Sequence, residues 1–105
     1  MTIGQRHYYR IPIFGPVRYE VQKRNGYGTV TNLSCRGWKI YGNMPLRAGD
    51  VCSLKVRLAA TLWVSVLVGI VRWAQGEESG IETMVMNDES TERLNRYIAE
   101  RMKAF

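Results

Sequence analysis

Two short clusters in the first third of the chain carry side chains suited to phosphate and purine groups. The first cluster, residues 6–10, reads Arg-His-Tyr-Tyr-Arg and supplies two guanidinium groups, those of Arg6 and Arg10. A guanidinium can grip a phosphate with two hydrogen bonds, bind the O6/N7 edge of guanine, or stack flat on a purine ring. Because Pro12 disfavours helix at the residue before it, we expect the segment to form an extended arm that can fold over a ligand.

The second cluster, Asn32-x-Ser34-x-x-Gly37, places an amide, a hydroxyl and a glycine after the strand-like residues 27–31. The Asn32 carbonyl can accept from the N1–H and N2–H2 edge of guanine, and the Ser34 hydroxyl is a small donor and acceptor. Gly37 suits either a positive φ angle or the close approach of a ligand. An ordinary serine turn capped by glycine is the alternative.

Chance explains the two clusters to different degrees. With eleven arginines in the chain, a pair at spacing four is expected roughly once, so Arg6 and Arg10 alone can be two solvated surface residues. Seven Asn or Asp, five Ser and ten Gly give an expected count of roughly 0.03 for the second pattern. The second cluster is therefore the more informative one.

The order and spacing of the clusters resemble the PilZ domain, a bacterial receptor module for the cyclic dinucleotide c-di-GMP. Family members carry RxxxR just before the first barrel strand and [D/N]xSxxG after the second. The resemblance continues through residues 69–73 (Gly-Ile-Val-Arg-Trp), residues 80–82 (Gly-Ile-Glu) and a terminal amphipathic helix, so it covers nearly all of the chain. It implies that Trp73 packs against a guanine face, whereas a core tryptophan is the alternative.

Two positions depart from the family pattern. Gln5 stands where many members have a further arginine, so we expect one c-di-GMP per chain, and Thr83 stands where an aromatic residue is usual. The resemblance implies a c-di-GMP site formed by Arg6, Arg10, Asn32, Ser34, Gly37 and Trp73. We include Gln5 in the site because it directly precedes Arg6.

Length and charge limit the possible partners. A chain of 105 residues suits a single domain, 1–105, with one core. The net charge of +6 is uneven, because residues 1–76 hold eleven basic and two acidic side chains and residues 77–105 hold four basic and seven acidic. A basic surface attracts phosphates, whether in a nucleotide, a nucleic acid or an anionic lipid, although an unspecific charged surface is the alternative.

Several classes of protein are disfavoured. The spacing of Cys35 and Cys52 matches no metal-binding motif, and His7 is the one histidine in the sequence. We therefore expect no metal and no cofactor. His7 also lacks a nucleophile with a supporting carboxylate, so we expect no enzyme. The longest apolar run, residues 58–71, is too short to span a bilayer, and residues 1–5 do not resemble a secretion leader. We expect a cytoplasmic location with reduced thiols.

Apolar periodicity predicts the elements. Alternating side chains predict strands at residues 17–21 and 52–58. The next strand is apolar on both faces, with Leu62, Val64, Val66, Val68 and Ile70 on one face and Trp63, Leu67 and Val71 on the other. The barrel interior should cover one face, and a helix or a second subunit, as in a homodimer, should cover the other.

Turn signals and a change of period complete the prediction. Asn25-Gly26 predicts the hairpin turn between the first two strands, and residues 43–50 and 75–79 predict two further breaks. From Asp88 the period becomes helical, with Asn87 or Asp88 as N-cap. We therefore expect a mainly β fold: a six-stranded antiparallel barrel of the PilZ type over residues 12–86, preceded by a flexible arm (1–11) and followed by one helix (88–105).

The resemblance implies a c-di-GMP receptor or adaptor that acts on an unidentified effector protein through ordering of its arm. The family association implies a role in motility, adhesion, biofilm or polysaccharide production. A nucleotide-independent PilZ adaptor in pilus or motility assembly is the second choice. It ranks below the receptor because such members usually lack the motif residues, whereas this chain keeps them. A small basic barrel that binds single-stranded nucleic acid, with strongly salt-dependent affinity, ranks third.

Overall fold

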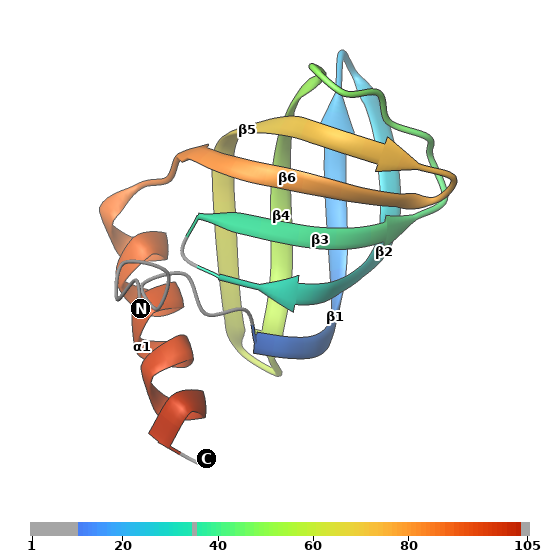
Figure 1. Cartoon of the computed structure of the whole chain (residues 1–105). Coiled ribbons are helices and arrows are strands. Elements are labelled where there is room, and N and C mark those ends of the chain that lie inside the picture. Colours follow the sequence, from blue (N-terminus) through green and yellow to red (C-terminus); the bar gives the residue numbers. More distant parts are fainter. Residues whose placement is uncertain (1–10, 35, 104–105) are drawn as a thin grey trace, which may run out of the picture.

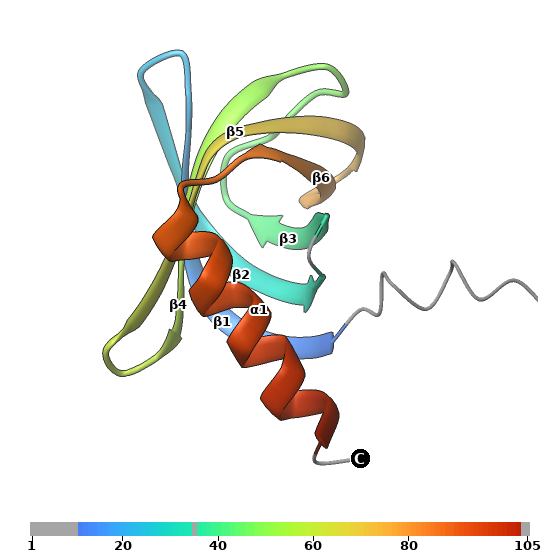
Figure 2. The same cartoon turned by 90° about the vertical axis from the view of Figure 1, so that its left-hand side faces the viewer.

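Six antiparallel strands form a closed barrel in the computed structural model, which describes residues 11–34 and 36–103 (Figure 1). The strands are β1 (Ile11–Val21), β2 (Arg24–Leu33), β3 (Gly37–Gly42), β4 (Val51–Ala59), β5 (Leu62–Gln75) and β6 (Glu78–Val85). Around the barrel they follow the order β1-β2-β3-β6-β5-β4, and β1 pairs with β4 to close it. Helix α1 (Asp88–Lys103) follows and lies along the outside of the barrel (Figure 2). The expected barrel with one C-terminal helix is confirmed.

The core consists of inward side chains that alternate along the strands. The alternation predicted for β1 and β4 is confirmed, because Tyr19, Leu54 and Val56 are buried while the residues on either side of each are exposed or half-buried. Burial raises the pKa of the Cys52 thiol to about 11, and the charge of Asp50 adds to the rise. Since the thiolate is the reactive form, Cys52 is a packing residue of the core.

The first hairpin turn lies at Gln22 and Lys23, and the prediction of a turn at Asn25-Gly26 is wrong. Gln22 and Lys23 have φ angles of 50° and 70°. Two consecutive positive φ angles are typical of the tight hairpin turn whose twist matches that of the strands. Asn25 and Gly26 lie within β2, where Gly26 is opposite Tyr19 on β1.

Tyr19 explains why glycine occupies position 26. Its ring fills the barrel interior so closely that a Cβ at Gly26 would lie 2.3 Å from Cζ, and one at Gly42 would lie 2.1 Å from the hydroxyl. That hydroxyl donates to the carbonyl of Met44 at 2.7 Å and accepts from its N–H at 3.0 Å. The ring is therefore fixed at its far end, and the two glycines leave room for it.

The inward face of β5 changes partway along the strand, so the single face predicted from Leu62 to Ile70 is wrong. Between Val66 and Gly69, β5 advances by one residue more than its partner β4, which is a β-bulge. After the bulge Val71, at 1% exposure, faces the core, while Ile70 is half-buried. A period of two cannot reveal such an extra residue.

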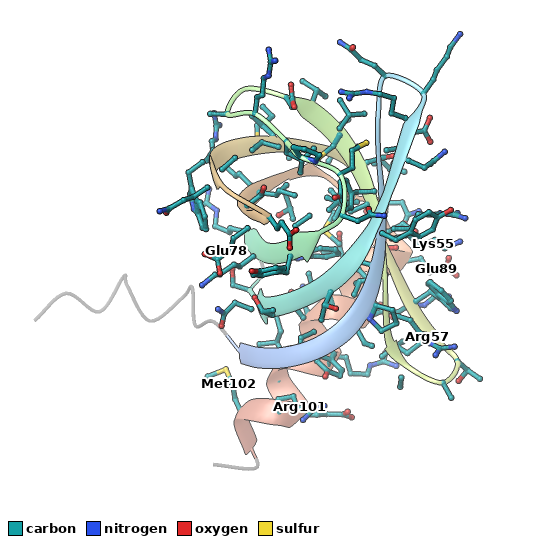
Figure 3. All side chains as sticks on the ribbon, turned by 90° about the vertical axis from the view of Figure 1, so that its right-hand side faces the viewer. Lys55, Arg57, Glu78, Glu89, Arg101 and Met102 are labelled. Carbon is teal, nitrogen blue, oxygen red and sulfur yellow. The ribbon has the colours of Figure 1, made fainter. Side chains whose placement is uncertain are left out.

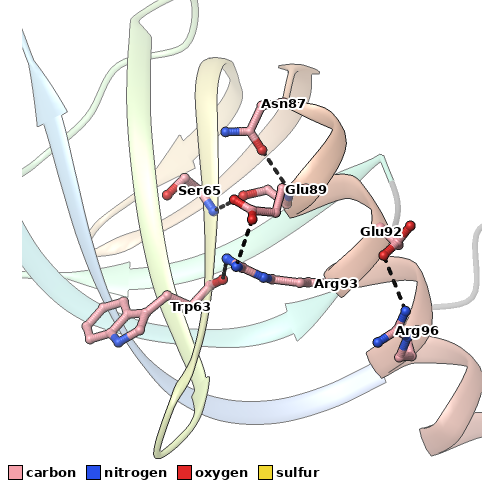
Figure 4. A network of polar contacts seen from close by, with 8 residues as sticks. Trp63, Ser65, Asn87, Glu89, Glu92, Arg93 and Arg96 are labelled. Carbon is pink, nitrogen blue, oxygen red and sulfur yellow. Dashed lines mark hydrogen bonds and ion pairs between the residues drawn. The ribbon is translucent and has the colours of Figure 1, made fainter.

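Helix α1 covers the part of β5 that precedes its pairing with β6 (Figure 4). The Asn87 side chain accepts from the Ser90 N–H at 2.7 Å and caps the helix as expected. Ser90 Oγ accepts from the Ser65 N–H at 3.0 Å, and Arg93 donates to the Trp63 carbonyl at 3.3 Å. The helix thus satisfies backbone groups on an edge that would otherwise face water.

The outer face of β5 is only partly covered. Trp63 and Leu67 remain 40% and 51% exposed. The Lys55 ammonium and the Arg57 guanidinium lie 5.4 and 5.9 Å from the centre of the Trp63 ring, and both side chains point away from the barrel (Figure 3). Cations from β4 thus supply part of the cover that the sequence assigned to a helix or a second subunit.

Gly26→Ala should lower the free energy of unfolding by about 1–3 kcal/mol, because the added methyl group must displace a buried ring. Urea denaturation measures the change. The neighbouring Asn25→Ala, on an exposed residue, is the control and should stay within about 0.5 kcal/mol of the parent protein. Equal stability of the two variants contradicts the role assigned to Gly26.

Candidate ligand-binding site

A hollow of about 480 Å³ opens where β3, β6 and the end of β5 meet the turn between β2 and β3. Its size is within the range of small-molecule sites. The residues that line it are Ser34, Arg36, Gly37, Trp38, Arg72, Trp73, Gly80, Ile81 and Glu82. The structure therefore brings together Ser34, Gly37 and Trp73, three residues that the sequence analysis proposed.

Ser34 holds the turn between β2 and β3. The side chain is buried, and its Oγ donates to the Gly37 carbonyl at 3.0 Å. The same oxygen accepts from the N–H groups of Gly37 and Arg36, at 3.0 and 3.3 Å. The hydroxyl is thus engaged within its own turn, as in the serine-turn alternative, and its effect is to fix where Arg36 and Gly37 lie.

Gly37 and Asn32 differ from what the sequence suggested. Gly37 begins β3 as an extended residue opposite Glu82, so a positive φ angle is not the reason for glycine there. Close approach of a ligand stays a prediction. Asn32 is half-buried, with Pro12 opposite on β1 and Lys39 opposite on β3, and it is outside the set that lines the hollow.

A second bulge in β5 places two consecutive side chains at the hollow. Val71 is opposite Ile81 and Trp73 is opposite Gly80, which leaves Arg72 as the extra residue. Regular alternation would send Arg72 and Trp73 to opposite faces of the sheet. Because the bulge changes the direction of one of them, both line the hollow.

Trp73 lies on the surface, so the alternative of a core tryptophan does not apply. The side chain is 41% exposed, whereas Trp38 is fully buried. The indole covers Gly80 so closely that a Cβ there would lie 2.1 Å from its Nε1. An exposed indole at the side of a hollow can stack with an aromatic base.

Opposite charges meet across β5 and β6. Arg72 Nε donates to Glu82 Oε1 at 2.6 Å, and both side chains are partly exposed. The Arg36 carbonyl accepts from the Thr83 N–H at 2.9 Å, which ties the turn to β6. Sequence reasoning quoted Arg72 and Glu82 only as parts of strand motifs. Their position in facing strands of one hairpin, around the Gly76 turn, is the signal that could have identified them.

The remaining predicted contacts, Gln5, Arg6 and Arg10, lie outside the described residues. The chain enters β1 at Ile11, one residue earlier than expected, and Ile11 is opposite Leu33. Leu33 directly precedes Ser34. Ile11, the residue to which Arg10 is bonded, is therefore close to the turn that borders the hollow.

The described part of the chain has neither a candidate metal cluster nor a membrane-spanning helix. Residues 11–34 and 36–103 contain no group of three or more His, Cys, Asp and Glu side chains that could hold a metal ion. Within the same ranges no helix is long and apolar enough to cross a membrane.

Comparison with known families matches residues 4–100 to the PilZ domain. The chain belongs to the PilZ family. This match confirms the family that the sequence analysis expected. PilZ domains are a family of c-di-GMP receptors. No curated protein matches the sequence significantly.

Two solved structures share the fold. The Bacillus subtilis inhibitor of motility, MotI/DgrA, has a TM-score of 0.79 and 16% identity over 92% of this chain and 51% of its own. The PilZ domain of CeSA, from a cellulose-synthesizing bacterium, has a TM-score of 0.69 and 15% identity over 90% of this chain and 98% of its own. The present chain therefore spans about half the length of MotI/DgrA.

Ser34→Ala should lower the free energy of unfolding by about 1–3 kcal/mol, because it leaves two partly buried N–H groups of the turn without their acceptor. Urea denaturation without ligand measures this effect. Ser53→Ala on β4, a half-buried serine away from the turn, is the control and should change stability by less than about 0.5 kcal/mol. If Ser34→Ala matches the control, the hydroxyl does not hold the turn.

Proposed function

We propose that this PilZ domain binds c-di-GMP in the hollow beside the β2–β3 turn and passes the signal to an effector protein, without catalysing a reaction. One observation carries the proposal. Ser34 and Gly37 of the second motif and Trp73, distant from them in the sequence, line a single hollow together with Arg36 and Arg72.

The chemistry of the hollow complements the ligand. c-di-GMP has two phosphates and two guanines. Arg36 supplies positive charge for the phosphates, Arg72 offsets the negative charge of Glu82 in the same hollow, and the exposed Trp73 ring supplies a surface for a guanine. Arg10 is bonded to Ile11 beside the site, and Arg6 is at most roughly 14 Å further along an extended chain. The proposal therefore assigns both motif arginines to the ligand.

The arm is the part of the proposal that transmits the signal. Residues 1–11 have few aliphatic side chains whose burial could offset the entropy of ordering. Ligand phosphates give Arg6 and Arg10 partners, so binding draws the arm across the hollow and creates a surface for the effector. MotI/DgrA is an inhibitor of motility, which favours an output in motility. The proposal also includes a cytoplasmic location and an effect on biofilm formation, as the sequence analysis expected.

Arg6→Ala and Arg10→Ala should each weaken c-di-GMP binding by about 1.5–3 kcal/mol, because each removes charge-assisted hydrogen bonds. Isothermal titration calorimetry measures the affinity and the number of ligands, which we expect to be one per chain because Gln5 adds no charge. Arg24→Ala, at the hairpin turn at the other end of β1, is the matched control and should bind like the parent protein.

The same titration separates the rival functions. GTP and short single-stranded oligonucleotides serve as competing ligands. Tight binding of oligonucleotides with a steep salt dependence favours the nucleic-acid function. Binding of none of these ligands favours the nucleotide-independent adaptor. Unchanged c-di-GMP affinity in both arginine variants removes the arm from the site.

Amide hydrogen exchange in residues 4–11 should slow when c-di-GMP is added, because the bound ligand orders the arm. Mass spectrometry of peptides from this segment measures the change, and a peptide from β4 serves as the internal control. If residues 4–11 exchange equally with and without ligand, the signal leaves by another route, such as helix α1.

A further inference from the structure

Glu82 is the one carboxylate among the described residues that line the hollow. Its side chain is 37% exposed. On β3 the residue opposite Glu82 is Gly37. Side chains of opposed residues project from the same face of a sheet, and Gly37 has none. The position beside Glu82 on β3 is therefore open, and the carboxylate can be reached from the hollow.

Trp73 and Glu82 lie next to each other on the same face. The Trp73 ring covers Gly80, which is two residues before Glu82 on β6. Residues two apart on a strand share a face and are separated by roughly 6.6 Å. A purine base stacked on Trp73 therefore has an edge within reach of the Glu82 carboxylate.

Arg72 orients this carboxylate and balances its charge. Arg72 Nε donates to Oε1 at 2.6 Å. A carboxylate has about four lone-pair sites, so one such bond leaves most of its accepting capacity. The guanidinium also offsets the repulsion between Glu82 and the ligand phosphates. Arg72 is thus a positioning residue for Glu82.

We propose that Glu82 reads the N1–H and N2–H2 edge of a guanine stacked on Trp73, so that the hollow selects guanine over adenine; this inference rests on the proposed c-di-GMP binding. A carboxylate only accepts hydrogen bonds, and guanine offers two adjacent donors at this edge. In adenine, N1 carries a lone pair in place of the N1–H donor of guanine. That lone pair would face the carboxylate oxygen, which also only accepts, and the two would repel each other. Glu82 therefore has the role that the sequence analysis gave to Asn32.

The test compares c-di-GMP with c-di-AMP in titrations of the parent protein and of Glu82→Gln. The parent protein should prefer c-di-GMP. A well-placed bidentate contact contributes about 1–3 kcal/mol, so Glu82→Gln should lose roughly 5- to 150-fold in c-di-GMP affinity. Because an amide both donates and accepts, the variant should keep or improve its affinity for c-di-AMP, and the preference should shrink or reverse.

Glu78→Gln is the matched control, since Glu78 is also on β6 and in an ion pair, with Lys39 at 3.1 Å, but does not line the hollow. It should leave the preference unchanged. If Glu82→Gln binds c-di-GMP as well as or better than the parent protein, or loses both ligands equally, Glu82 does not read the base, while c-di-GMP binding itself stands. If the parent protein binds neither ligand, the proposed function fails together with this inference.

Discussion

Closure of the barrel is the constraint on which the rest of the structure depends. The order of the six strands is circular, so β1 must meet β4 after the sheet has curved through a full turn. Strands as long as β1 and β5 can follow that curve only by bending, and a β-bulge bends a strand by inserting one residue. The registers shift within Pro12–Gly15, Val30–Asn32, Val68–Gly69 and Val71–Trp73, among other places.

The candidate site lies where one of these β-bulges, in β5, meets the turn between β2 and β3. The bulge in β5 brings Arg72 and Trp73 to the same hollow, and the serine-held turn after β2 brings Arg36 beside them. Both features belong to the hydrogen-bonded frame of the barrel and not to a long loop. A site built on strands holds its side chains more precisely than one on loops. The stability of the barrel and the geometry of the hollow are therefore linked.

Local patterns in the sequence predicted the elements but not their long-range contacts. The alternation in β1 and the N-cap of α1 depend on nearby residues, and both were found. The sequence analysis interpreted Gly26 as a turn residue. Glycine is required there because the ring of Tyr19, on another strand, occupies the space that a side chain would fill, and no local pattern shows that contact. The role proposed for Glu82 was not predicted, because it depends on the register between β3 and β6, which no local pattern contains.

The second motif, Asn32-x-Ser34-x-x-Gly37, sets the shape of the turn between β2 and β3. Ser34 uses its hydroxyl to close the turn, and the turn sets the position at which Gly37 enters β3. At that position a side chain would project beside Glu82, the residue opposite, and would fill the space next to its carboxylate. The absence of a side chain at Gly37 and the presence of an acid at Glu82 are therefore two parts of one arrangement. A glycine that looks like a turn residue in the sequence is, in the barrel, an extended strand residue that leaves the space beside Glu82 open.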